Sequence, residues 1–324
     1  MAIVDIIIPL YNKAETVTRA VQSILEQTVT DWCLIIVDDG STDNSLQNVR
    51  QFADPRIQII EQENRGPGAA RNRGIQEATA TYIAFLDADD QWYPSCLENA
   101  LIVFEKKRVS FVGAIYDEWP SRVNMAAYWA KQNVCSGTYE LTGSEHPKEV
   151  LSKLFFFHVG NTLVRTSIAR KYGGFYDAEK CLLGEDTVFF AKLLLNEPFA
   201  IIDSIAVRHN RQDSDLSNLR QRPLDIFLHK PEVILDHCGE EKRSFARRVL
   251  AWHALRIAHF RARSGQKTDA LYLKDAFVEM RQFRFLYGKL CIEIKLSRYL
   301  SCWVRFKCFV ASYLKNRGCR STGP

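Results

Sequence analysis

The stretch from Tyr82 to Asp90, YIAFLDADD, decides the fold, because an apolar run ends there in three carboxylates. A short aromatic and aliphatic run that ends in turn-forming residues predicts a buried β-strand. On extended backbone, Asp87 and Asp89 are two positions apart, so we expect their side chains to point the same way. Neighbouring carboxylates repel each other unless a positive charge lies between them, and a divalent cation carrying phosphate oxygens supplies that charge. The alternative for this stretch alone is a solvated acidic turn.

Alternating strand and helix patterns surround this stretch in the amino-terminal part of the chain. Apolar runs predict strands at residues 3–10, 32–37, 57–60 and 82–86. Apolar residues at helical spacing follow each of the first three strands, and this alternation predicts a parallel α/β sheet with right-handed crossovers. Ligands of such sheets bind past the carboxyl ends of the strands. We therefore expect Tyr11, Asp39 and Asp87 to converge.

These groups have the chemistry to bind a nucleotide. The Tyr11 ring can stack on a base, and the Asp39 carboxylate can accept a hydrogen bond from a base N–H or a ribose hydroxyl. Arg71 lies near an expected helix start and can pair with phosphate oxygens. The alternatives are packing for Tyr11 and surface pairing for Arg71. The chain has no GxGxxG or GxxxxGK[ST] motif, so neither a dinucleotide fold nor a P-loop is supported.

Five ordered motifs resemble the inverting family 2 glycosyltransferases with the GT-A fold. They are IIIPLYN at 6–12, IVDDGSTD at 36–43, NRGPGAARNRG at 64–74, FLDADD at 85–90, and GGF at 173–175 followed by GED at 184–186. The resemblance covers about residues 1–215. It implies a mostly parallel α/β sheet, flanked by helices, that binds a nucleotide-diphospho-sugar.

The resemblance also implies residue roles. Asp87-Ala88-Asp89 would be the DxD motif, with Asp89 as a ligand of Mn²⁺ or Mg²⁺ and Asp87 reaching the ribose or the metal. Asp186 would be the catalytic base of the ED motif. The implied donor-binding residues are Pro9, Tyr11, Asp39, Arg71, Asp87 and Asp89, and the candidates for acceptor or diphosphate contacts are Glu185, His209 and His158. The alternatives are an acidic helix cap for Glu185 and a partly buried, hydrogen-bonded histidine for His158.

From these motifs we predict a metal-dependent, inverting, hexosyltransferase-like glycosyltransferase. It would move a sugar from a nucleotide-diphospho-sugar, in the first place a UDP-sugar, to a hydroxyl of a saccharide or lipid-linked acceptor. Family analogy places it in cell-surface polysaccharide or lipopolysaccharide assembly. One alternative is a non-catalytic nucleotide-sugar or glycan-binding module on the same fold, which predicts a broken DxD or ED motif. Another is a nucleotidyltransferase, which would lack the paired DxD and ED arrangement.

The chain divides into a predicted GT-A catalytic domain at residues 1–215 and a helical, basic region at 216–324. Residues 281–324 carry ten Lys or Arg and one acid, Glu293, so the segment has a net charge of +9 and residues 1–280 have −4. We predict that residues 281–320 form a basic amphipathic segment on an anionic membrane surface. The alternative is a packed helix with a solvated basic face. Nucleic acid is not an expected partner, because no recognised reading module is present.

Cysteine use and the amino terminus indicate the compartment. The nine cysteines are odd in number and form no CxxC pair, which argues against a disulfide framework or zinc site and for a reducing compartment. The amino terminus lacks the basic region and cleavage site of a signal peptide. No apolar run approaches the ~18 residues of a membrane span. We therefore expect a cytoplasmic protein that is peripheral on the inner face of the membrane if the basic segment binds lipid.

Overall fold

The computed structural model describes residues 2–181, 183–213 and 223–297. The chain forms two compact units, residues 1–243 and 244–324. The first is an α/β unit, and the second is helical over its described residues, 244–297. The domain boundary predicted at 215/216 lies within residues 214–222, outside the described residues, and stays a prediction.

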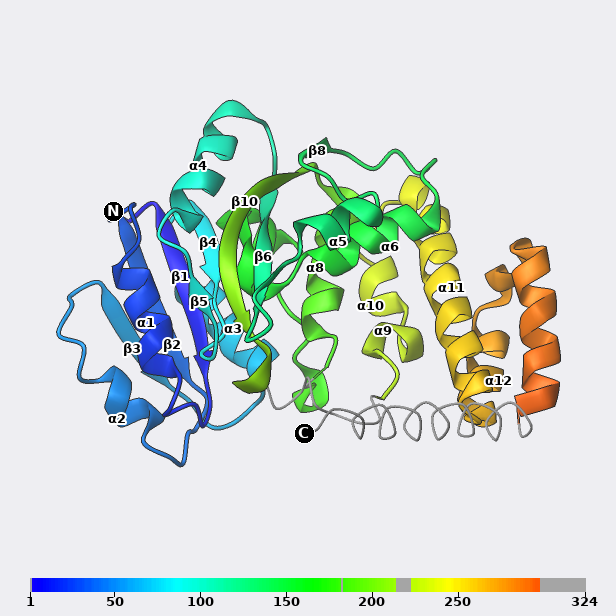
Figure 1. The fold of residues 1–324 in the computed structure, drawn as a ribbon, viewed down its shortest axis with the longest axis horizontal. Coiled ribbons are helices and arrows are strands. Elements are labelled where there is room, and N and C mark those ends of the chain that lie inside the picture. Colours follow the sequence, from blue (N-terminus) through cyan, green and yellow to red (C-terminus); the bar gives the residue numbers. More distant parts are fainter. Residues whose placement is uncertain (1, 182, 214–222, 298–324) are drawn as a thin grey trace, which may run out of the picture. The chain divides into compact units, whose positions relative to one another are not determined.

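The first unit is built on a ten-stranded sheet (Figure 1). Eight of these strands lie in the order β3-β2-β1-β4-β9-β6-β10-β5, while β7 pairs with β6 and β8 pairs with β10. The described strands are β1 Val4–Leu10, β2 Trp32–Asp38, β3 Ile57–Glu61, β4 Tyr82–Phe85, β5 Gln91–Trp92, β6 Phe111–Trp119, β7 Val123–Asn124, β8 Gly137–Tyr139, β9 Thr162–Arg165 and β10 Phe199–Asn210. The order confirms the predicted α/β architecture.

The four amino-terminal strands are all parallel, as their apolar runs predicted. Side chains such as Ile6, Ile7 and Ile8 are fully buried, because a parallel strand inside a sheet is covered on both faces. Leu10 lies opposite Asp38 in the register of β1 and β2. The residues that follow these strands therefore gather at one edge of the sheet.

The rest of the sheet is mixed. Strand β9 is antiparallel to both β4 and β6, while β10 runs parallel to β6. The short strands β5, β7 and β8 pair antiparallel with their neighbours. The pairing of β10 with β6 shifts register twice, at Ile202/Ile205 and Ile205/Val207. Such irregularities bend a strand and redirect its side chains, and β10 ends beside the acidic turn with His209 and Asn210.

Helices flank this sheet (Figure 1), and among them α3 packs against β1 and β2 while α4 packs against β6 and β10. The helices of the first unit are α1 Val17–Leu25, α2 Ser45–Val49, α3 Pro67–Glu77, α4 Cys96–Lys106, α5 Ala126–Lys131, α6 Pro147–Phe156, α7 Thr166–Lys171, α8 Glu185–Asn196, α9 Ile226–His229 and α10 Glu232–Leu235, with 3-10 turns η1 Val159–Asn161, η2 Ala178–Lys180 and η3 Arg211–Asp213.

The prediction of extended backbone through Asp89 is wrong. Strand β4 ends at Phe85, and the next residues form a turn in which the amide of Asp90 donates to the carbonyl of Asp87 at 3.0 Å. Opposite Phe85, the partner in β1 is Ile7, so the chain leaves the sheet before the acidic residues. The carboxylates come together through this turn rather than through the alternation of a strand.

The backbone around the motif at 173–175 is held by Asn72 of α3 and Lys192 of α8, and we call this set of contacts the clamp. The Asn72 side chain donates to the Phe175 carbonyl at 2.9 Å and accepts from the Phe175 amide at 2.8 Å. The Phe175 ring then stacks on Phe189, with centroids 4.4 Å apart. The buried Lys192 ammonium donates hydrogen bonds to the carbonyls of Tyr172 and Gly174 at 2.6 and 2.7 Å. The clamp fixes the chain that leads to α8.

Gly174 tests this clamp. It has φ +66°, and a Cβ there would lie 2.2 Å from Asn72 Oδ1. We expect Gly174→Ala to lower the free energy of unfolding by about 2–4 kcal/mol, from left-handed backbone strain and loss of the Asn72 hydrogen bonds. Gly173→Ala is the matched control, since Gly173 has φ +69° with nothing within 4 Å of its Cβ position. Urea denaturation measures both variants, and equal losses would contradict the clamp.

The second unit contains most of α11 Glu240–Arg263, then α12 Lys267–Ala276, η5 Val278–Gln282 and a helical segment at 284–297. Within this segment Glu293 is buried, where it receives hydrogen bonds from Arg263 at 2.7 and 2.9 Å and lies 2.6 Å from His259 Nδ1. No helix among the described residues combines the length and apolar character needed to cross a bilayer.

Candidate functional site

A cavity of about 570 Å³ lies past the carboxyl ends of β1, β2 and β4. The candidate residues that line it are Pro9, Tyr11, Asp39, Arg71, Asp87, Asp89, Glu185, Asp186 and His209. The expected convergence of Tyr11, Asp39 and Asp87 is therefore confirmed. Of the candidates, His158 does not line the cavity, although its neighbour Val159 does.

One end of the cavity carries Tyr11 and Asp39. The Tyr11 side chain is 47% exposed, so its ring is available for stacking. The Asp39 carboxylate is buried and accepts from Gln62 Nε2 at 2.7 Å and from the amides of Arg65 and Gly66 at 2.9 and 2.8 Å. These bonds tie the end of β2 to the loop before α3. A carboxylate has about four acceptor sites, so Asp39 can accept one further donor.

The acidic turn forms the floor of the cavity. Asp87, Asp89 and Asp90 each place a carboxylate oxygen within 4.8 Å of the others. Burial, and then the neighbouring Asp87, raises the pKa of Asp89, while Lys13 lowers it in part. Burial raises the pKa of Asp90 more strongly, and the Asn210 amide donates to its Oδ1 at 2.8 Å. Three clustered carboxylates fit a hard divalent cation, which prefers oxygen ligands and relieves their repulsion.

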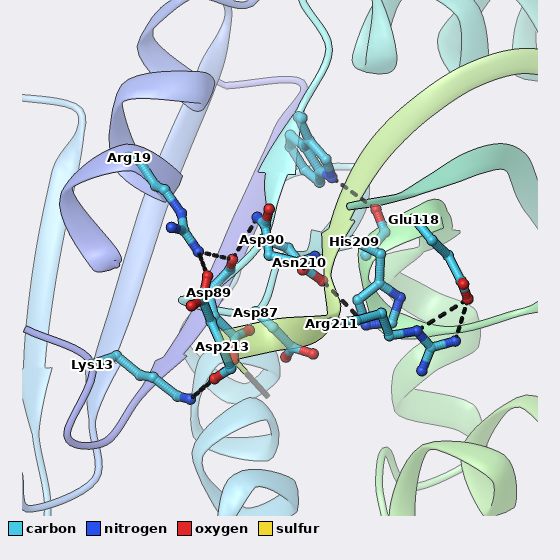
Figure 2. Close-up of polar contacts among 12 residues, drawn as sticks. Lys13, Arg19, Asp87, Asp89, Asp90, Glu118, His209, Asn210, Arg211 and Asp213 are labelled. Atoms are coloured by element: carbon cyan, nitrogen blue, oxygen red, sulfur yellow. Dashed lines mark hydrogen bonds and ion pairs between the residues drawn. The ribbon is translucent and has the colours of Figure 1, made fainter. Parts of the chain in front are cut away.

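Basic residues that the motifs did not identify surround this turn (Figure 2). Lys13 Nζ lies 3.0 Å from Asp89 Oδ2 and donates to the Asp213 carbonyl at 2.8 Å. Arg19 donates to the Asp89 carbonyl at 2.6 Å and to the Asp213 carboxylate. Lys13 had a sequence signal, since it lies two residues after Tyr11. Asp213 lies four residues after the candidate His209, and the course of β10 brings it to the site.

Arg71 connects the two acidic motifs. Its guanidinium is buried and donates to Asp87 Oδ1 at 2.7 Å and to Glu185 Oε1 at 2.9 Å. Burial disfavours the charged guanidinium, but Asp87 and Glu185 outweigh burial and raise the pKa of Arg71. Arg71 therefore stays charged and joins residues that are distant in sequence. Its role as a donor contact stays a prediction.

Glu185 and Asp186 begin α8, which starts after Gly184 with φ 87°. The predicted position of Asp186 in the first helical turn is confirmed. Asp186 Oδ1 accepts from the Thr187 amide at 2.6 Å. Burial raises the pKa of Asp186 while Arg71 partly offsets it, and burial with the Asp186 charge raises the pKa of Glu185 to about 7. An aspartate with a raised pKa is a better general base near neutral pH than a free one.

His209 and His158 lie side by side next to the acidic turn. His209 Nε2 is 3.9 Å from Asp90 Oδ2, too far for a hydrogen bond. The two imidazole centroids are 5.4 Å apart, and the His158 ring meets Tyr116 edge-on at 4.6 Å. Burial lowers the pKa of both histidines. Both rings are therefore neutral near pH 7, and their roles toward acceptor or diphosphate stay predictions.

Comparison with known proteins gives the following matches. The family model described as "Glycosyl transferase family 2" matches residues 5–173. EpsJ of Bacillus subtilis (strain 168), an uncharacterized glycosyltransferase, is 30% identical over 233 residues, which are 70% of this chain and 67% of EpsJ. The Escherichia coli "UDP-Glc:alpha-D-GlcNAc-diphosphoundecaprenol beta-1,3-glucosyltransferase WfgD" is 37% identical over 116 residues, which are 36% of this chain and 46% of WfgD.

The matched stretch thus spans less than half of WfgD. Among solved structures, Staphylococcus aureus TarS 1–349 superposes with a TM-score of 0.70 at 19% identity, covering 95% of this chain and 92% of that one. The same fragment in complex with UDP-GlcNAc gives 0.67 at 18% identity, covering 93% and 88%. At this identity the likeness concerns the fold.

Proposed function

Because the chain belongs to glycosyl transferase family 2, we propose that it is an inverting hexosyltransferase that uses a nucleotide-diphospho-sugar. One observation carries the proposal: a single buried guanidinium, that of Arg71, holds both Asp87 of the acidic turn and Glu185 of the ED motif. The groups suited to a donor diphosphate and the group suited to act as a base therefore share one cavity.

The donor lies along the cavity in this proposal. Tyr11 stacks on the nucleobase, in the first place uracil, and Asp39 accepts a hydrogen bond from it. Asp89, with Asp87 and Asp90 beside it, would hold Mn²⁺ or Mg²⁺. When bound, the cation would supply positive charge that stabilises the departing diphosphate. Arg71 donates hydrogen bonds to Asp87 and Glu185 and so fixes their orientation beside the sugar.

Asp186 performs the proton transfer. The acceptor hydroxyl oxygen forms a bond to the anomeric carbon while the bond from that carbon to the diphosphate oxygen breaks, and its electron pair leaves with the diphosphate. The hydroxyl proton passes to Asp186, whose orientation is held by the Thr187 amide. Attack opposite the leaving group inverts the anomeric configuration.

The acceptor in this proposal is a saccharide on a lipid diphosphate, used in surface polysaccharide assembly. The support is the relative WfgD, whose name states a glucosyl transfer from UDP-Glc to alpha-D-GlcNAc-diphosphoundecaprenol. The same name supports UDP as the donor nucleotide. Both remain proposals for this chain.

A panel of nucleotide sugars tests the proposed reaction. Purified protein with Mn²⁺ is incubated with each donor, and release of nucleoside diphosphate is measured with and without a lipid-diphosphate saccharide. We expect a UDP-hexose to be consumed and the product, by NMR, to have the inverted anomeric configuration. Binding of UDP without turnover would support a non-catalytic module instead, and release of pyrophosphate would support a nucleotidyltransferase.

We also propose that residues 281–320 hold the protein on an anionic membrane, on the cytoplasmic face. Residues 298–320 of this segment lie outside the described residues. In the helical segment 284–297, Phe285 and Ile292 are 84% and 59% exposed, and spacing of seven residues puts them on one helix face. Lys289 and Lys295 are also exposed, while Glu293 is turned inward. Such a basic and apolar surface fits anionic lipid headgroups.

The vesicle affinity of the full chain tests this placement. Each basic residue near an anionic surface contributes about 1 kcal/mol before salt screening, so Lys289→Gln with Lys295→Gln should weaken binding up to about 25-fold. Sedimentation with anionic and neutral vesicles at low salt gives the measurement. Lys106→Gln with Lys107→Gln, both exposed at the end of α4, is the control. Equal binding by all variants would favour the packed-helix alternative.

A further inference from the structure

Lys13 is presented to the cavity by a turn whose backbone is held by the loop after β2 and by the first residue of α2. The Lys13 amide donates to Ser45 Oγ at 2.7 Å, and the Asn12 amide donates to Ser41 Oγ at 3.1 Å. Asn12 has φ 49°, a left-handed conformation that asparagine tolerates better than most residues. The Asn12 side chain in turn accepts from the Thr42 amide at 2.8 Å. The position of the Lys13 Cα is therefore set by several polar contacts.

The Lys13 ammonium is directed at the acidic turn. Its Nζ lies 3.0 Å from Asp89 Oδ2 and 2.8 Å from the Asp213 carbonyl (Figure 2). The guanidinium of Arg71 is already held by Asp87 and Glu185, and Arg19 contacts the main-chain carbonyl of Asp89 rather than its carboxylate. Among the ion pairs of the described residues, Lys13 is the partner of the Asp89 carboxylate.

A divalent cation and the Lys13 ammonium need the same carboxylate. Two cations at one carboxylate repel each other, and the repulsion is strong where burial lowers the effective dielectric constant. The lysine side chain has a flexible four-carbon stem and a compact charge. The ammonium can therefore move away from Asp89 while the turn that carries it stays in place. The oxygens of a diphosphate beside the acidic turn are the natural new partner for this charge.

On the basis of the proposed function, we propose that Lys13 is a donor-binding residue with two partners. It pairs with Asp89 until a divalent cation takes this carboxylate, and it then pairs with the donor diphosphate. Lys13 thus opposes binding of the cation alone and favours binding of the cation together with a nucleoside diphosphate. A lysine that only stabilised the turn would influence both equilibria in the same direction.

Calorimetry on Lys13→Met tests whether the affinity for the cation alone and the affinity for the nucleoside diphosphate with the cation change in opposite directions. Removing a partly exposed ion pair should tighten binding of Mn²⁺ alone by about fivefold. Losing a charge-assisted contact should weaken binding of UDP at saturating Mn²⁺ by about tenfold or more. Lys13→Arg keeps the charge and should recover UDP binding in part. Lys107→Met removes the same charge at an exposed position that does not line the cavity, and it should change neither constant.

Two outcomes overturn the proposal: Lys13→Met weakens Mn²⁺ and UDP alike, or it changes neither. An Asp89→Asn arm separates this result from the proposed function. Loss of Mn²⁺ binding in Asp89→Asn places the cation on the acidic turn whatever Lys13 does. Retention of Mn²⁺ binding by Asp89→Asn would overturn the cation site itself and, with it, the role of Lys13.

Discussion

We expect Asp186→Asn to lose about two to four orders of magnitude in kcat while its affinity for UDP with Mn²⁺ stays close to that of the parent protein. Asparagine has the size of aspartate and can still accept from the Thr187 amide, a bond of 2.6 Å in the structure. It cannot take the proton of the acceptor hydroxyl. Initial rates of sugar transfer and calorimetric Kd values on the same preparations measure the two effects.

The pH profile provides a second readout for Asp186. Burial raises the pKa of Asp186 despite the opposing Arg71, and only the ionised carboxylate can act as a base. The rate should fall as the pH drops through this raised pKa, so the acid limb lies above the ~4 of a free aspartate. Glu185→Gln, a matched change at the neighbouring carboxylate, should cost less. Transfer by Asp186→Asn within a few-fold of the parent would mean that another residue is the base.

Asp89→Asn should remove metal-dependent nucleotide binding. A neutral amide attracts a divalent cation far less than a carboxylate does. We expect the affinity for UDP with Mn²⁺ to fall by about a hundredfold or more, as is typical when one member of a desolvated charge pair is removed. Affinity measured without metal should change much less.

Asp31→Asn is the control for this variant. Asp31 is exposed and precedes β2, at the edge of the sheet opposite the cavity. Both variants should keep the thermal midpoint of the parent within a few degrees. If Asp89→Asn retains metal-dependent UDP binding, Asp89 is not a ligand of the cation and the acidic turn has another function.

The amino-terminal half of the site was readable from the sequence because local patterns determine it. Continuous apolar runs such as Ile6–Ile8 predict parallel strands covered on both faces. Strand ends in such a sheet meet at one edge, which is why Tyr11, Asp39 and Asp87 line a single cavity. The same pattern identifies each of the four amino-terminal strands, but it does not give the end of β4 at Phe85.

The other half depends on contacts that no local pattern records. The turn at Asp87–Asp90 replaces the expected extended backbone, because β4 ends at Phe85. Asn210 reaches Asp90 only after the register shifts of β10 have redirected this strand. Arg71 looked like a phosphate ligand near a helix start, but it pairs with Asp87 of the acidic turn and with Glu185, which comes near Arg71 only through the placement of α8.

The order of strands in the sheet has a consequence for how the chain folds. Strands β3, β2, β1 and β4 are neighbours and come from the first 85 residues, so they can assemble as soon as that part is synthesised. The polar links that complete the site join residues 114, 120 and 200 positions apart. Contacts of such separation form slowly. Until β10 inserts between β6 and β5, the long edge of β6 remains open to pairing with another chain. Residues 199–213 thus both cover this edge of β6 and bring Asn210 and Asp213 to the site.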